Sequence, residues 1–261
     1  MSQTLLVPAV TLAITLAMMF VVWLLSLSKK DSSIVDIFWG IGFVLIAGVC
    51  FVLGDGYVGR KLLVSVLTAL WGIRLAAYIL WRNAGKGEDY RYRAMRSRYG
   101  KRFPLVSLLL VFGLQGLLMW IISMPLQVAG SSREPARFTW LDWTGASLWL
   151  AGFLFESIGD FQLARFKSDP NNAGQVMDRG LWRYTRHPNY FGDATLWWGF
   201  FLIALSTPRG AWTIFSPLIM TTLLMKVSGV ALLEKTLRKT KPEYQNYIER
   251  TSAFVPWPPG T

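Results

Sequence analysis

The sequence predicts an all-α, polytopic integral membrane protein with about seven transmembrane helices. Three observations support this fold class. Hydrophobic residues make up 53% of the 261 residues and the mean hydropathy is +0.37, which is high for a water-soluble domain. Apolar runs long enough to cross a bilayer, which takes about 17–25 residues, recur along the chain. Connecting segments alternate between rich and poor in Lys and Arg, as successive membrane crossings require.

The apolar runs define the expected helices in order. They cover residues 4–27, 33–53, 61–81, 105–126, 141–164, 190–206 and 211–233. The first run lacks a basic start and is too long for the apolar part of a signal peptide, so we expect it to be a retained helix. Most connections are short, and we therefore predict a single helical membrane domain over 1–261 with no linker and no repeat.

The charge distribution predicts how the helices are oriented. Segments 28–32, 82–104, 166–189 and 234–261 together carry 19 Lys and Arg, whereas segments 54–61, 126–139 and 207–211 carry 5. Because Lys and Arg accumulate on the cytoplasmic side, we place the N-terminus outside and the C-terminus in the cytoplasm. The net charge of +12 therefore indicates membrane orientation, and we expect no nucleic-acid partner. With one Cys and one His, a Cys/His zinc site is excluded and we expect no metal.

Polar residues inside the second and third helices are candidates for catalysis. Asp36 lies in an apolar helix, where a carboxylate costs about 2.5–3.5 kcal/mol unless it faces the interior of the bundle with a partner. It is either an interfacial Asp bonded to its own helix start or an acid in a substrate cavity. Trp71, Arg74, Tyr78 and Arg82 share one face of the third helix. Arg74 needs an anion, either Asp36 in a structural ion pair or a cofactor phosphate, and the Tyr78 phenol can donate to a carbonyl.

Two further polar segments favour a binding site. Glu156, Asp160 and Lys167 share one face of the fifth helix, which indicates a polar cavity rather than a lipid-facing surface. The loop 86–102 interleaves charges with aromatic rings at Arg91 and Tyr92. This loop is either a basic segment that touches lipid or a site for a phosphate with a stacked base, and both can hold together.

The densest polar cluster runs from Gly180 to Asp193, directly before the apolar run at 194–206. A polar cluster at the boundary of water and lipid is costly unless it binds something. No glycine-rich Rossmann motif follows a strand and no Walker sequence is present, so a bound nucleotide must be held by helix ends and cytosolic loops.

These motifs resemble the steroid 5-alpha-reductase superfamily, and within it the bacterial branch of membrane proteins that carry its C-terminal domain. The resemblance extends from about 31 to 258 and is strongest over 156–193. It rests on Asp36-Ile-Phe-Trp-Gly, Glu88-Asp89-x-Arg91-Tyr92, Asp160, Gln162, Phe166, Lys167, the run Arg186-His-Pro-Asn-Tyr-Phe-Gly-Asp193, and the tail residues Glu234, Tyr244, Tyr247 and Pro256.

The resemblance implies an NADPH-dependent oxidoreductase that reduces a carbon–carbon double bond in a lipophilic substrate taken from the bilayer of the bacterial inner membrane. A 3-oxo-Δ4-steroid, a sterol or another enone or lipid fits this description. Together with the polar faces described above, it assigns catalysis to Asp36, Tyr78 and Arg74. It assigns cofactor binding to Asp160, Lys167, Arg91, Tyr92, Tyr184, Arg186, His187, Asn189, Tyr190 and Asp193. The sequence departs from the animal steroid enzymes in that it lacks their Gln-Glu pair. The position of their catalytic tyrosine aligns most simply with Trp71, with Tyr78 nearby on the same helix face.

Two alternatives remain open at this point. Membrane methyltransferases of the isoprenylcysteine and phospholipid type also carry Arg-His-Pro-x-Tyr-x-Gly and bind S-adenosylmethionine, but they usually have a paired Glu-Glu near the tail. Here Glu234 is followed by Lys235, and an acid follows Gly192, which favours the reductase. A non-enzymatic protein that binds lipids or acts as a scaffold is the other alternative, although it would not need polar faces on three separate helices.

Overall fold

The structure is a computed structural model that describes residues 3–227 and 229–260. Within these residues every regular element is a helix. The chain forms two compact units, which we call the N-terminal unit (Met1–Thr139 with Ala204–Thr213) and the C-terminal unit (Trp140–Ile203 with Ile214–Thr261). An all-helical fold is thus confirmed for the described residues, and a single domain over 1–261 stays a prediction.

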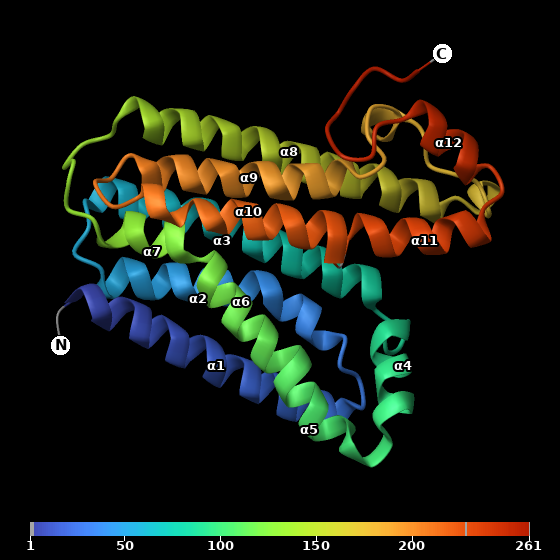
Figure 1. The fold of residues 1–261 in the computed structure, drawn as a ribbon, viewed down its shortest axis with the longest axis horizontal. Coiled ribbons are helices and arrows are strands. Elements are labelled where there is room, and N and C mark those ends of the chain that lie inside the picture. Colours follow the sequence, from blue (N-terminus) through green and yellow to red (C-terminus); the bar gives the residue numbers. More distant parts are fainter. Residues whose placement is uncertain (1–2, 228, 261) are drawn as a thin grey trace. The chain divides into compact units, whose positions relative to one another are not determined.

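The N-terminal unit consists of three long helices followed by shorter ones (Figure 1). Its helices are α1 (Gln3–Lys29), α2 (Ile34–Leu53), α3 (Val58–Asn83), α4 (Tyr90–Tyr99), α5 (Phe103–Ser107), α6 (Leu114–Ile122) and α7 (Met124–Ser131). A π-helical segment, η2 (Leu108–Gly113), joins α5 to α6 into one continuous helical run. The short helix α4 runs crosswise to α1, α2 and α3 (Figure 1).

Small residues allow α2 and α3 to pack closely. A Cβ atom added at Gly40 would lie 2.3 Å from the carbonyl oxygen of Gly72, so only glycine fits at this crossing. Close backbone contact through small residues is typical of helices in membranes. Trp71 is fully buried beside this crossing, and its ring lies 5.5 Å from that of Phe43.

The C-terminal unit contains five α-helices and two short 3-10 turns in its long connection. They are α8 (Trp140–Ser168), η3 (Pro170–Asn172), η4 (Gly180–Arg183), α9 (Pro188–Leu205), α10 (Phe215–Thr222), α11 (Val230–Thr240) and α12 (Tyr244–Arg250), with a π-helical segment η6 (Leu223–Val227) after α10. Helices α8 and α9 approach most closely at Gly192, where a Cβ atom would lie 2.4 Å from the Glu156 backbone nitrogen.

All seven apolar runs lie mainly in helices, and four helical segments of the described residues are long and apolar enough to cross a membrane: Leu5–Lys29, Ile34–Leu53, Val58–Asn83 and Tyr90–Ile122. Charged residues on α8 and polar residues in the first turns of α9 lower the hydropathy of those helices. The protein is thus a multi-helix membrane protein, whereas seven crossings and the orientation of the termini stay predictions. Ser228, inside the last predicted run, lies outside the described residues.

Candidate functional site

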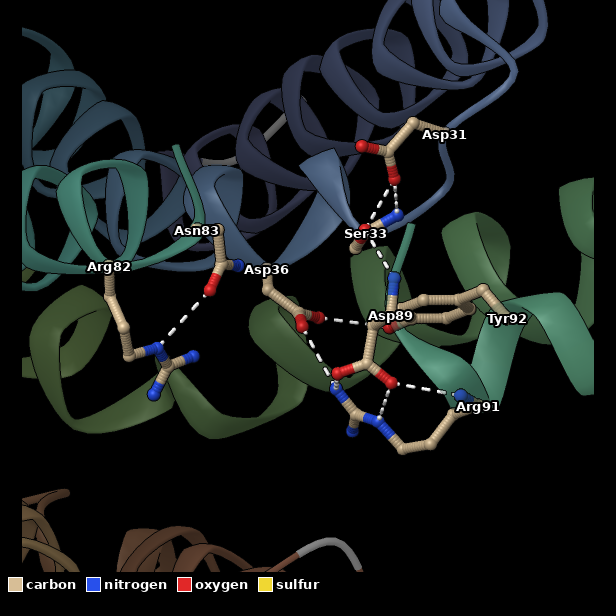
Figure 2. A network of polar contacts seen from close by, with 8 residues as sticks. All are labelled: Asp31, Ser33, Asp36, Arg82, Asn83, Asp89, Arg91 and Tyr92. Carbon is tan, nitrogen blue, oxygen red and sulfur yellow. Dashed lines mark hydrogen bonds and ion pairs between the residues drawn. The ribbon is translucent and has the colours of Figure 1, made fainter. Parts of the chain in front are cut away.

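The N-terminal unit holds a polar cluster around Asp36, which we call the Asp36 cluster (Asp36, Asp89, Arg91 and Tyr92; Figure 2). Asp36 lies in the first turn of α2. Its Oδ1 accepts a 2.9 Å hydrogen bond from the Tyr92 hydroxyl, and its Oδ2 lies 3.1 Å from Nη2 of Arg91. The Asp36 side chain is 21% exposed. The carboxylate is therefore held by a phenol and a guanidinium and still reaches the surface of its own unit.

Asp89 anchors the start of α4 and orients Arg91. Its carboxylate accepts a 2.9 Å hydrogen bond from the Arg91 backbone nitrogen, which caps the helix, and a 3.0 Å bond from Arg91 Nε. The Asp89 backbone nitrogen donates to Ser33 Oγ at 3.1 Å. Burial raises the pKa of Asp89, but the hydrogen bonds and charge of Arg91 outweigh it and the pKa is lowered. Arg91 thus bridges two carboxylates, Asp36 and Asp89 (Figure 2).

A second contact ties the same loop to the start of α2. Glu88 accepts hydrogen bonds from Arg96 at 2.8 and 3.1 Å and from the Ser32 backbone nitrogen at 2.8 Å. Burial raises the pKa of Glu88, but the bonds from Arg96 and Ser32 prevail and lower it. Together with the Asp89 contacts, these bonds fix α4 against the end of α2.

The residues predicted to share one face of the third helix do not pair with Asp36 as expected. The Arg74 guanidinium lies over the ring of Tyr78, 6.0 Å from its centroid, and Arg82 lies over the same ring at 5.7 Å. The ion-pair partner of Asp36 is Arg91 and not Arg74. The reason is geometric: loop 84–89 folds back so that the start of α4 meets the first turn of α2.

The C-terminal unit brings together most of the predicted cofactor residues. Asn189, at the start of α9, donates a 3.1 Å hydrogen bond from Nδ2 to Oδ1 of Asp160 on α8. The Asn189 Oδ1 atom is buried and has no hydrogen-bond partner among the described residues. Glu156 and Asp160 are both buried, as their shared face predicted, and so is Asp193, whereas Lys167 is exposed. The two helices thus present an amide acceptor beside three buried acids.

The only histidine forms a buried triad with Arg186 and Glu234 of α11. Arg186 Nε donates to Glu234 Oε1 at 2.8 Å, and His187 Nε2 lies 3.3 Å from the same oxygen. The His187 ring stacks on Tyr190, with centroids 5.5 Å apart and planes 8° apart. Burial lowers the pKa of His187 despite the hydrogen bond to Glu234. Burial raises the pKa of Glu234, but its bonds to His187 and Arg186 lower it to about 2.

Arg186 also organises the C-terminal tail. Its Nη1 donates to the carbonyls of Ile248, at 3.1 Å, and Thr251. Its backbone nitrogen donates to the carbonyl of Ser252 at 2.9 Å. The tail continues along the same segment, where Trp257 donates its backbone N–H to the Tyr184 carbonyl. Arg186 thus uses its donors inside the protein, whereas the sequence assigned it to cofactor phosphates.

Sequence reasoning missed two features of the site. It did not include Glu234 among the site residues, although a lone acid on the otherwise apolar and basic helix α11 was a usable signal. It also did not foresee that Arg91 and Tyr92 bind Asp36, while their assignment to the cofactor stays a prediction. No sequence signal distinguished Tyr92 from Tyr78 as the phenol nearest the carboxylate. Among residues 3–227 and 229–260, no three His, Cys, Asp or Glu side chains gather to hold a metal ion.

The fold and these clusters define the class as a helical membrane protein with buried polar sites. The chain belongs to the family described as Protein of unknown function (DUF1295), which matches residues 22–251. It is 27% identical over 263 residues to Uncharacterized protein C594.04c of Schizosaccharomyces pombe, covering 90% of this chain and 76% of that protein. It is also 30% identical over 73 residues to 3-oxo-5-alpha-steroid 4-dehydrogenase 1 of Bos taurus, covering 28% of each. No solved structure matches the chain.

Proposed function

We propose that the protein is a membrane-embedded, NADPH-dependent reductase of a carbon–carbon double bond in a lipophilic substrate. The observation that carries the proposal is the Asn189–Asp160 pair, in which a buried amide oxygen is available as an acceptor. The local similarity to a 3-oxo-5-alpha-steroid 4-dehydrogenase supports the reaction class. The motif resemblance supports a bacterial inner-membrane protein with seven crossings, an outer N-terminus and a cytoplasmic C-terminus.

The residues of the C-terminal unit fit the chemistry of a nicotinamide cofactor. An acceptor such as Asn189 Oδ1 complements the carboxamide N–H of nicotinamide, and pairing it removes the cost of a buried unsatisfied atom. Loop 180–183 docks on α8, where Trp182 Nε1 donates to the Gly159 carbonyl at 3.0 Å. This contact brings the exposed Arg183 to the part of α8 that carries Asp160. Cations suit phosphate groups, and a 2′-phosphate adds charge that favours NADPH over NADH.

Each residue cluster has a distinct task in this proposal. NADPH, when bound, supplies a hydride to one carbon of the double bond. Asp160 orients the Asn189 amide, and His187 with Tyr190 offers a stacked aromatic surface. Arg186 and Glu234 hold the tail and the motif in position. These residues bind and orient and do not themselves react.

We assign the donation of a proton to the substrate to the Asp36 cluster. The Tyr92 hydroxyl already donates to Asp36, so a phenolic proton and a carboxylate share one hydrogen bond. A carbonyl conjugated to the double bond gains negative charge during reduction, and a donor aimed at its oxygen stabilises that charge. Arg91 and Asp89 keep the pair in position. Tyr92 thereby takes the phenol role that the sequence assigned to Tyr78. The assignment of this cluster to the reduction comes from the family resemblance.

Isothermal titration of the purified protein with NADPH, NADH and S-adenosylmethionine tests the proposal. We expect NADPH to bind, and Asn189→Ala, Asp160→Ala and Lys167→Ala each to weaken it. Loss of a charge-assisted hydrogen bond costs about 1.5–3 kcal/mol, or roughly tenfold to more than a hundredfold in affinity. Arg165→Ala removes another exposed cation from the same helix and should leave the affinity unchanged. Tight binding of S-adenosylmethionine, with no effect of the three substitutions on NADPH, would favour the methyltransferase.

A further inference from the structure

Helix α4 has two different faces. Tyr92 is buried and Tyr99 half-buried on the side that packs on the rest of the N-terminal unit, with Arg91 at the edge of this side. The rest of the helix surface is exposed, with Arg93 on one flank and Arg98 on the other. The exposed side continues past the end of the helix into two further exposed cations, Lys101 and Arg102. We call Arg93, Arg98, Lys101 and Arg102 the basic patch.

The acids of this region do not neutralise the basic patch. Glu88 is bound by Arg96, and Asp89 by Arg91. In the part of the chain that the structure describes, no carboxylate lies within 4.0 Å of any side chain of the basic patch. Glu88 and Asp89 thus fix α4 in place through Arg96 and Arg91, and the charges of the basic patch stay exposed.

The length of the adjoining span places α4 at the height of the lipid headgroups. The helical segment Tyr90–Ile122 has 33 residues, which would correspond to roughly 50 Å if they formed one straight α-helix. The hydrocarbon core is only about 30 Å thick, a distance that the apolar residues from Leu105 to Ile122 cover by themselves. Leu105 and Leu109 are more than 60% exposed, as expected of side chains that face lipid. Because α4 also runs crosswise to the long helices (Figure 1), we infer that it lies along the membrane surface.

We propose that the basic patch binds the phosphate groups of anionic phospholipids in the leaflet at this end of the N-terminal unit. The charge of the patch complements these headgroups, and Arg binds phosphate oxygens through two parallel hydrogen bonds. Exposed Tyr90 lies one turn before Arg93 on α4, and aromatic rings of this kind favour the interface between lipid and water. This surface is separate from the residues assigned to NADPH and to the proton.

The test measures lipid selectivity rather than activity. The protein is reconstituted into phosphatidylcholine membranes, and spin-labelled phosphatidylglycerol and phosphatidylcholine report their relative association with it. We expect selectivity for phosphatidylglycerol that weakens in high salt, because exposed charges are screened. In Arg93→Gln/Arg98→Gln it should fall by about fivefold for each cation removed. Arg93→Lys/Arg98→Lys keeps the charge and should retain most of the selectivity.

A control removes two exposed arginines at the other ends of α2 and α3, of which Arg133 lies 2.8 Å from Asp55. Arg133→Gln/Arg137→Gln should leave the selectivity unchanged, since a backbone bond between Tyr57 and Ser132 places that loop at the start of α3. Equal losses in both double variants, or no loss in either, would overturn the proposal. So would a fall in NADPH affinity in Arg93→Gln/Arg98→Gln with the lipid selectivity intact. If that variant does not fold, Lys101→Gln/Arg102→Gln provides the same comparison.

Discussion

Replacing Glu234 with Gln should release the C-terminal tail from the segment that carries His187. The Glu234 side chain is only 11% exposed and accepts its closest hydrogen bond from Arg186. Burial raises the pKa of Glu234, but the bonds from His187 and Arg186 lower it from 4.5 to about 2. At roughly 1.4 kcal/mol for each pH unit, this fall corresponds to about 3 kcal/mol of stability. Because the pKa is depressed, the contribution is complete above pH 4.5 and is lost as the pH falls toward 2.

Hydrogen–deuterium exchange measured at pH 7 in detergent resolves this effect locally. The backbone N–H groups of Arg186 and Trp257 donate to the carbonyls of Ser252 and Tyr184, so these two amides report on tail release. A loss of about 3 kcal/mol corresponds to roughly a hundredfold faster exchange. In the wild-type protein, acid should produce the same release below pH 4.5, whereas Glu234→Gln should not respond to pH in this range.

Glu243→Gln is the matched control, because Glu243 is an exposed acid whose carboxylate accepts a hydrogen bond from the neighbouring Asn246 side chain. This variant should exchange as the wild type does. If Glu234→Gln leaves both tail amides as protected as before, the triad does not hold the tail. If it accelerates exchange equally in α7 of the N-terminal unit, the effect is global unfolding and the reasoning is wrong as well.

Three other predictions concern the remaining parts of the protein. Asp36→Asn should keep NADPH binding but lower turnover of an activated alkene by about 10²–10⁴, the usual range for general acids; unaltered turnover would remove Asp36 from the reaction. Gly192→Ala should cost about 1–3 kcal/mol of stability, because a Cβ there meets the α8 backbone, and this should appear as a lower melting temperature. Gly48→Ala has open space and should not lower it. With the native cysteine replaced, cysteines at positions Ser97 and Ser132 should be labelled from opposite sides of the membrane, and labelling of both from one side would contradict the predicted topology.

Hydropathy and spacing predicted the helices and part of the site. The first three long apolar runs correspond to α1, α2 and α3, because the hydropathy of a segment is a local property that the sequence shows directly. The shared face of Glu156 and Asp160 was also predictable, since residues four apart lie on the same side of a helix. Helix α4 was not predicted, because its sequence is too polar to form an apolar stripe.

The pairing of charges was beyond the reach of the sequence. The sequence offered Arg74 as the partner of Asp36, and the return of the loop 84–89, which brings Arg91 there instead, could not be read from it. In the same way, Arg186 lies in a motif that suggests phosphate binding, yet its side chain donates a hydrogen bond to Glu234, 48 residues later in the chain. Such choices depend on tertiary geometry, which neither composition nor periodicity encodes.

Transfer of a labelled hydride tests the central claim most directly. The purified protein is incubated with NADPH deuterated at the transferable position of nicotinamide and with a panel of lipophilic enones, and products are analysed by mass spectrometry. The account predicts a saturated product that carries one deuterium, formed about 10²–10⁴ times more slowly by Asp36→Asn and requiring higher NADPH concentrations in Asn189→Ala. Recovery of unreduced enones throughout, together with transfer of a labelled methyl group from S-adenosylmethionine to a lipid, would contradict it.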